Sequence, residues 1–199
     1  MPGRKIIQET YVSVKNWDDL IPDDFAKRWR KWFAELNSLE RLVIPRCYCT
    51  VNVDAYELHT FCDASKGLGC VSYLRILKND TVHIAFVMGK SKVVPMGCTL
   101  SIPRLELIAL NIGSRMHWQI KKFSTTVIEQ LLFVYRFFCS NRLASKYSNE
   151  VEKMGSRRVF EIQRICNGDK WLKIPTEYNV VDLCSRGLNP KKLIQMECI

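Results

Sequence analysis

The residue of this sequence best placed to do chemistry is Asp63, an acid at the end of a short apolar segment. Residues 57–65 combine apolar and small residues, and residues 67–74 begin with glycines and continue as an apolar run. This pattern predicts a strand, a tight turn and a second strand, with the carboxylate at the end of the first strand. A carboxylate placed there can hold a metal ion. Taken alone, Asp63 also fits a turn or cap residue at a hairpin end.

Two more acids stand at predicted helix starts. Pro103 begins a helix whose apolar positions share one face, and Glu106 lies in its first turn, beside that face. Asp182 begins a short helix over 182–186, which Gly187 caps. Singly, a glutamate in a first turn is a partner for the helix dipole, and an aspartate at a helix start is an N-terminal cap. These structural interpretations stay open for each acid on its own.

The elements that must position these acids alternate between strands and helices. Residues 22–24 are predicted to open an amphipathic helix, whose aromatic and leucine positions from Phe25 to Leu39 are spaced by three and four. Residues 82–88 predict a third strand that continues the hairpin as an antiparallel meander, followed by a basic loop from residue 89. Residues 131–135 predict a buried fourth strand and residues 171–174 a fifth. The pattern indicates an α/β (or α+β) fold.

Length, composition and charge limit the folds and partners that the chain can have. A chain of 199 residues with 47% hydrophobic content can bury one good core. The net charge of +10 favours a polyanionic partner such as nucleic acid, although a basic protein of another kind has the same charge. No run reaches the roughly 18 apolar residues of a membrane span, so we expect no membrane partner.

The cysteine pattern speaks against a structural zinc site. The nine cysteines form no Cys-x-x-Cys pair, and the chain has only three histidines. An odd cysteine count without a signal peptide indicates reduced thiols, and therefore an intracellular protein, cytoplasmic or nuclear. The cysteines lie at positions 47, 49, 62, 70, 98, 139, 166, 184 and 198.

Five motifs in order carry a resemblance to a known family. They are Ile44-Pro45-Arg46, Glu57-Leu58-His59 with Phe61 to Ser65, Lys90 to Val93 with Pro95, Ile102 to Leu107, and Asp182 to Gly187. Together they resemble the ribonuclease H-like region of Bel/Pao-type LTR retrotransposon polyproteins. Residues 16–19 and the Trp-rich helix after them resemble the connection that follows the reverse transcriptase there. The resemblance implies a connection-like helical segment over 1–46 and a ribonuclease H-like domain over 47–199, with a mixed five-stranded sheet and flanking helices.

The resemblance also implies a reaction and its residues. Hydrolysis of the RNA strand of an RNA/DNA hybrid uses two divalent ions about 3.5 to 4 Å apart, and Mg2+ or Mn2+ in such sites prefers carboxylate oxygens. By resemblance, Asp63, Glu106 and Asp182 are catalytic metal ligands that would meet a fourth acid. At the position of that acid the chain has Cys139, whose thiol is a soft ligand and a poor substitute for an oxygen. Decay of a genomic copy explains this departure, and a shifted alignment is the other account.

Three functions follow as hypotheses. The first is a ribonuclease H-like domain, ancestrally a two-metal hydrolase in reverse transcription and degenerate here. The second is a non-catalytic nucleic-acid-binding or connection module, or a retroelement remnant. The third, an aspartic protease, fails because no Asp-Thr-Gly or Asp-Ser-Gly triplet occurs.

The expected partners are RNA/DNA hybrid or other nucleic acid and the remainder of a retrotransposon polyprotein. Three basic residues flank the implied site and can contact phosphates, although exposed loops are commonly basic. They are Lys90, Lys92 and Arg104.

Overall fold

The chain is described here from a computed structural model. The structure describes residues 2–14, 16–45, 47–48, 52–65, 67–97, 100–124, 128, 130–135, 153–175, 178–182, 185, 187 and 189–195. The expected third-ligand position, Cys139, lies outside these residues.

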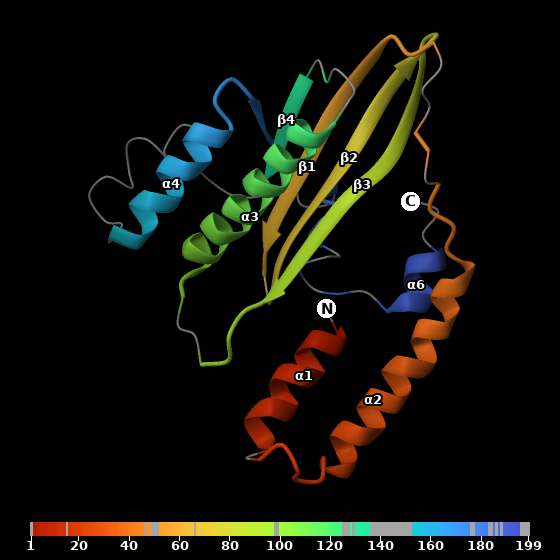
Figure 1. The fold of residues 1–199 in the computed structure, drawn as a ribbon, viewed down its shortest axis with the longest axis vertical. Coiled ribbons are helices and arrows are strands. Elements are labelled where there is room, and N and C mark those ends of the chain that lie inside the picture. The colour runs from red at the N-terminus through yellow and green to blue at the C-terminus, as the bar shows by residue number, and fades with distance from the viewer. Residues whose placement is uncertain are drawn as a thin grey trace.

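The described residues form one mixed sheet with the strand order β3-β2-β1-β4-β5. Strands β1 (Ala55–Ala64), β2 (Gly67–Lys78) and β3 (Thr81–Val93) are antiparallel. Strands β4 (Gln130–Tyr135) and β5 (Lys170–Lys173) continue the sheet in parallel on the other side of β1. The prediction of an α/β fold with an antiparallel meander is confirmed (Figure 1).

Strand β3 corrects one expectation. Residues 89–92 were predicted as a basic loop, but β3 continues through them to Val93. Glycine and lysine are weak strand formers, so local preference indicates a loop there. Pairing with the start of β2 outweighs this preference, because the ladder runs on to the pairs Lys92 with Leu68 and Val93 with Gly67. Lys90 and Lys92 are therefore strand residues, whose side chains have a fixed face.

Helix α3 (Ile102–Phe123) packs along β1 and β2, and α4 (Lys153–Ile165) packs beside α3 (Figure 1). Periodic apolar residues of α3 meet the strands in a buried core. The approach is closest at Gly113, where a Cβ atom would lie 2.2 Å from the Sγ atom of Cys62. The core of this layer contains Cys62, Cys70, Leu107, Leu110, Met116, Val159, Ile162 and Cys166.

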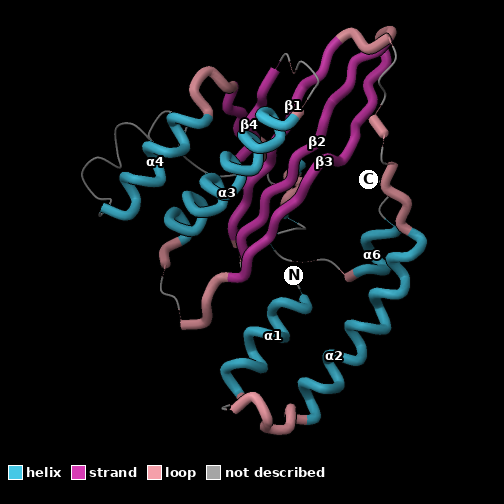
Figure 2. The backbone as a smooth tube through the Cα atoms, in the orientation of Figure 1, coloured by secondary structure: helices cyan, strands magenta, loops and turns pink. Residues whose placement is uncertain are grey.

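The N-terminal residues form a separate helical group with the last helix. It contains α1 (Pro2–Ser13), α2 (Asp23–Leu36), a 3-10 turn (Asn37–Arg41) and α6 (Pro190–Gln195), and Figure 2 shows them gathered beside the sheet. The ring of Trp32 packs so closely on Gly3 that a Cβ atom there would lie 2.6 Å away. The side-chain amide of Gln8 donates to the carbonyl of Val94, just after β3, at 2.8 Å. The group is thus tied to one end of the sheet.

The predicted amphipathic helix is shorter than expected. It ends as an α-helix at Leu36, and the 3-10 turn takes the next five residues. The hydroxyl of Ser38 bonds to the carbonyl of Glu35, a local bond that competes with the continuing helix. Among the described residues, no helix combines the length and apolar content needed to cross a bilayer.

The close approach of α3 to β1 gives a first prediction. Gly113→Ala should lower the free energy of unfolding by about 1 to 3 kcal/mol, because overpacking outweighs the gain in helix propensity. Denaturant unfolding measures it. In the double variant Gly113→Ala with Cys62→Ala the clash is absent, so the two changes should cost less together than the sum of their separate costs. Additive costs would contradict the proposed contact.

Candidate functional site

Asp63 lies at the carboxyl end of β1 and is only 5% exposed. The hydroxyl of Ser185, itself fully buried, donates to its Oδ2 atom at 2.7 Å. Ser185 Oγ also lies 3.0 Å from the Oγ atom of Ser65, two residues after Asp63. A buried carboxylate needs such polar partners, because burial of a charge without them is costly. These contacts bring residues more than a hundred positions apart to one strand end.

Asp182 belongs to the same C-terminal turn as Ser185. The backbone N–H of Ser185 donates to the carbonyl of Val181 at 3.0 Å, which is a helical bond, and Val181 is fully buried. The amide of Asp182 donates to the carbonyl of Asn179 at 3.1 Å. The side chain of Asp182 is half-buried. The structure therefore brings the segment that carries Asp182 to the end of β1.

Glu106 reaches this strand end from the other face of the sheet. Neighbouring side chains of a strand point to opposite faces, and Cys62 faces α3, so Asp63 faces away from α3. The prediction of Glu106 in the first turn is wrong, because α3 already begins at Ile102 and Glu106 follows the first turn. Glu106 is half-buried and lies seven residues before Gly113, on the same side of the helix. Asp63 and Glu106 thus belong to opposite faces of β1.

The described carboxylates do not complete an ion site. In the described part of the chain, no group of three or more histidine, cysteine, aspartate or glutamate side chains is arranged to hold a metal ion. The oxygen ligands of Asp63, Glu106 and Asp182 suit a hard divalent ion chemically. The donor set that the resemblance implies is therefore suitable in kind and incomplete among these residues.

Lys90 and Lys92 lie on the α3 face, opposite to Asp63. Their direct strand neighbours are Cys70 and Leu68, which both pack into the core under α3. The ammonium group of Lys90 donates to the side-chain oxygen of Gln119 on α3 at 3.1 Å. Arg104 lies exposed in the first turn of α3. The two lysines therefore lie on the face of the sheet that α3 covers, and Arg104 lies on α3 itself.

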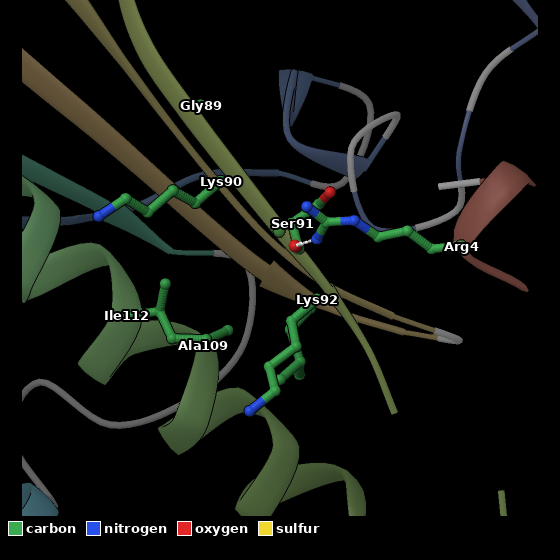
Figure 3. A pocket seen from close by; sticks show the side chains of 9 residues that line it. Arg4, Gly89, Lys90, Ser91, Lys92, Ala109 and Ile112 are labelled. Carbon is green, nitrogen blue, oxygen red and sulfur yellow. Dashed lines mark hydrogen bonds between the residues drawn. The ribbon is translucent and has the colours of Figure 1, made fainter. Parts of the chain in front are cut away.

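Both lysines line a pocket of about 510 Å³ between β3 and α3, which Figure 3 shows from close by. Ala109 and Ile112 of α3 form its other wall. Arg4 of α1 also lines this pocket and donates a hydrogen bond to the backbone carbonyl of Ser91 (Figure 3). Sequence reasoning missed Arg4, since no local signal indicates a contact between residues 87 positions apart.

Three buried polar side chains are hydrogen-bonded to one another where α3 packs on β1 and β2. The Nδ1 atom of His117 and the Oγ atom of Ser72 each lie 2.8 Å from the hydroxyl of Thr60, and all three side chains are buried. The Nε2 atom of His117 is 3.8 Å from Asp169 Oδ2, too far for a hydrogen bond. Burial, together with the charge of Lys121, lowers the pKa of His117 to about 4. His117 is therefore neutral at pH 7 and serves the packing of α3 on the sheet.

Removal of the Ser185 hydroxyl tests the contact at Asp63. Ser185→Ala should lower the free energy of unfolding by about 1 to 3 kcal/mol, because a buried carboxylate loses a short hydrogen bond. The matched control is Ser114→Ala, which removes a buried hydroxyl that donates only to the carbonyl of Asn111 in its own helix. Denaturant unfolding should show the larger loss for Ser185→Ala. Equal losses would contradict a special role for the bond to Asp63.

The low pKa of His117 predicts acid sensitivity. Because its folded-state pKa lies below the unfolded value of 6.5, its contribution to stability is complete above pH 6.5. That contribution declines as the pH falls from 6.5 to about 4, by about 3 kcal/mol in total. Unfolding free energies measured across this range should fall less steeply in His117→Gln than in the unaltered chain. The same slope in both proteins would show that His117 does not titrate in this way.

Comparisons with known proteins add to this geometry. The family described as Pao retrotransposon-like RNaseH-like domain matches residues 1–135, which include Asp63 and Glu106 and end before Cys139 and Asp182. A search among curated proteins finds no match.

Several solved structures are similar in fold at low identity. LC11-RNase H1 in complex with RNA/DNA hybrid is 12% identical with a TM-score of 0.44, over 69% of this chain and 99% of that one. RNase H1 from Halobacterium salinarum NRC-1 is 12% identical with a TM-score of 0.36, over 62% and 89% of the two chains. The foamy viral protease-reverse transcriptase in complex with RNA/DNA hybrid is 12% identical with a TM-score of 0.38, over 92% and 27%.

The family match spans more than half of the chain and covers the first three strands and α3, the elements that carry the motifs around Asp63, Lys90 and Glu106. The chain belongs to the Pao retrotransposon-like RNaseH-like domain family and is a retrotransposon-derived ribonuclease H-like domain.

Proposed function

We propose that this domain binds RNA/DNA hybrid at the strand end marked by Asp63 and descends from an enzyme that cut the RNA strand. The observation that carries the proposal is the bond from Ser185 to Asp63, which brings the turn of Asp182 to the end of β1. Glu106 lies near the start of the helix that covers the other face of the same strand. We propose that Asp63, Asp182 and Glu106 approach one another at this end of the sheet, as an acid cluster for hydrolysis requires.

Asp63, Glu106 and Asp182 are proposed as the remaining ligands of a Mg2+ or Mn2+ centre. Their oxygens are the ligands that such ions prefer, whereas the thiol of Cys139 is not. The thiol of Cys139 at the position of the expected third acid supports a weak or absent activity in the chain as it stands. Nucleic-acid binding does not need that centre, so a binding or connection role can outlast the loss of hydrolysis.

Basic residues support the binding part of the proposal. Lys90 and Lys92 line the pocket between β3 and α3, and Arg104 stands exposed at the start of α3. Phosphate contacts of this kind bind without regard to sequence and weaken as salt rises. A net charge of +10 adds long-range attraction for a polyanion.

We also propose where the two domains begin and end and where in the cell the protein is located. Residues 1–46 act as a connection-like segment to the remainder of a polyprotein, and residues 47–199 as the ribonuclease H-like domain. An intracellular location, cytoplasmic or nuclear, is supported by the odd cysteine count and by the free thiols among the described residues. These are Cys47, Cys62, Cys70 and Cys166.

Cleavage of a labelled RNA/DNA hybrid tests the hydrolytic ancestry. The unaltered chain should cut little with magnesium or manganese, and Cys139→Asp should cut measurably, because a hard ligand replaces a soft one. Adding Asp63→Asn to Cys139→Asp should abolish the cleavage. Cleavage by the unaltered chain would contradict the loss of activity, and no cleavage by either protein would contradict the assigned ligands.

Binding of an uncut hybrid is measured on the same proteins. Lys90→Ala and Lys92→Ala should each weaken binding and lower the slope of log affinity against log salt by about 0.9. Lys31→Ala, on the exposed face of α2, is the control and should leave both unchanged. If all three variants bind alike, or if the unaltered chain does not bind, the hybrid-binding proposal is wrong.

A further inference from the structure

A second pocket lies away from Asp63, between the C-terminal half of α3 and α4. Its volume is about 860 Å³. It neighbours the pocket of Lys90, because Gln119 lines it and accepts the hydrogen bond from the Lys90 ammonium group. Its charged and aromatic lining includes Arg115, Trp118, Lys121, Lys122, Glu161 and Arg164.

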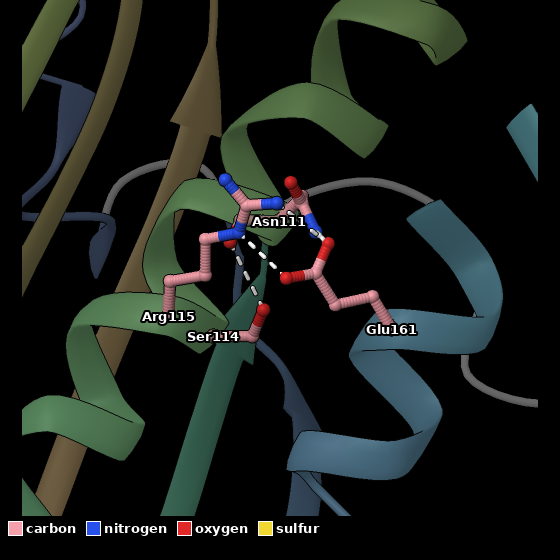
Figure 4. Close-up of polar contacts among 4 residues, drawn as sticks. All are labelled: Asn111, Ser114, Arg115 and Glu161. Atoms are coloured by element: carbon pink, nitrogen blue, oxygen red, sulfur yellow. Dashed lines mark hydrogen bonds and ion pairs between the residues drawn. The ribbon is translucent and has the colours of Figure 1, made fainter. Parts of the chain in front are cut away.

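The one acid of this lining is already neutralised. Arg115 donates to both oxygens of Glu161 at 2.7 Å, and the side-chain amide of Asn111 donates to one of them at 3.1 Å (Figure 4). These bonds lower the pKa of Glu161 to about 2, so that it stays ionised and paired with Arg115. The pair also joins α3 to α4, and both of its residues line the pocket (Figure 4).

Three cations remain after this pairing. Within the described residues, Lys121, Lys122 and Arg164 form no ion pair with an acid. Lys121 is exposed, and its charge also acts on the buried side chains of Asp169 and His117. Lys122 and Arg164 are exposed and stand in the last turns of α3 and α4. Cations at helix ends complement the helix dipoles, but that role does not need an aromatic neighbour.

Trp118 supplies the aromatic neighbour. Its side chain is 44% exposed, and the ammonium group of Lys122 lies 4.9 Å from its ring centroid. Phe123 is exposed beside it, with the same ammonium group 5.6 Å from its ring. Proteins that bind single-stranded nucleic acid combine a basic groove for the backbone with exposed aromatic rings on which unpaired bases stack. A base-paired duplex has no free base faces along its length.

We propose that this surface binds a single-stranded stretch of nucleic acid. Lys122 and Arg164 contact its phosphates, and Trp118 stacks against an unpaired base. Lys122 lies sixteen residues after Glu106, which places the surface about 24 Å along α3 from Glu106, or about seven nucleotides of duplex rise. An unpaired end that extends from a hybrid bound at Asp63 can reach it, and its binding does not require hydrolysis.

The test is fluorescence anisotropy with a labelled oligouridine, an oligothymidine and a blunt RNA/DNA hybrid over a range of salt concentrations. Trp118→Ala should weaken binding of both single strands at least about 5-fold, the lower end of what one stacked base contributes. Trp118→Phe should retain most of the affinity. Lys122→Ala should lower the salt slope by about 0.7. The blunt hybrid should bind all three variants almost equally.

Matched controls separate this surface from general effects of charge and aromatic content. Trp17 is 93% exposed and lies outside the pocket, so Trp17→Ala should leave binding unchanged, as should Lys31→Ala. Thermal unfolding checks the fold of each variant, and if Trp118→Ala does not fold, Lys122→Ala and Trp118→Phe decide. Equal effects of Trp118→Ala and Trp17→Ala, or no binding of single strands by the unaltered chain, would overturn the proposal. If only Lys90→Ala and Lys92→Ala fail to change binding as expected, the proposed hybrid site is wrong and the proposal for single strands is unaffected.

Discussion

The contact between α3 and β1 at Gly113 and Cys62 fixes the position of the candidate site. Only a residue without a side chain lets the helix lie this close to the strand, where even a Cβ atom would overlap the sulfur. With Cys62 turned toward α3, the strand pleat turns Asp63 to the opposite face. The same contact sets how far the N-terminal part of α3, and with it Glu106, extends toward the end of β1.

The two faces of the sheet consequently have different roles. On the face away from α3, Asp63 is buried and receives the hydroxyl of Ser185. On the α3 face, Lys90 and Lys92 reach the surface beside the helix. A hybrid that reaches both must lie across the end of the sheet and not along one face. This geometry also explains why α1, held at the end of β3 by Arg4 and Gln8, stands next to the proposed binding region.

Polar groups in the interior have partners that offset most of the free-energy cost of burying them. Thr60, Ser72 and His117 share hydrogen bonds beneath α3, and burial keeps His117 neutral. Glu161, by contrast, stays charged because Arg115 and Asn111 hold it at the surface between α3 and α4. Helix α3 is therefore joined to the sheet by a neutral polar network, and α3 is joined to α4 by an ionic one.

The sequence by itself determined the elements and the family. Alternating apolar residues indicated the meander, Pro103 and its apolar periodicity indicated α3, and Asp63 was placed at a strand end; each of these signals is local. Local signals also misled, since the glycine and lysines of residues 89–92 indicated a loop where pairing with β2 maintains a strand. The ribonuclease H-like motifs identified the family because they occur in a fixed order along the chain.

Only the tertiary structure decided which residues meet. The bond from Ser185 to Asp63 joins positions 122 residues apart, and that from Arg115 to Glu161 joins positions 46 apart. Neither pairing has a signature in composition or spacing, because each depends on how helices dock onto the sheet. The faces of Asp63 and Lys90 likewise follow from strand register and from the side on which α3 packs. Which side chain another one contacts depends on how the elements pack, and the periodicity of a single segment does not determine that packing.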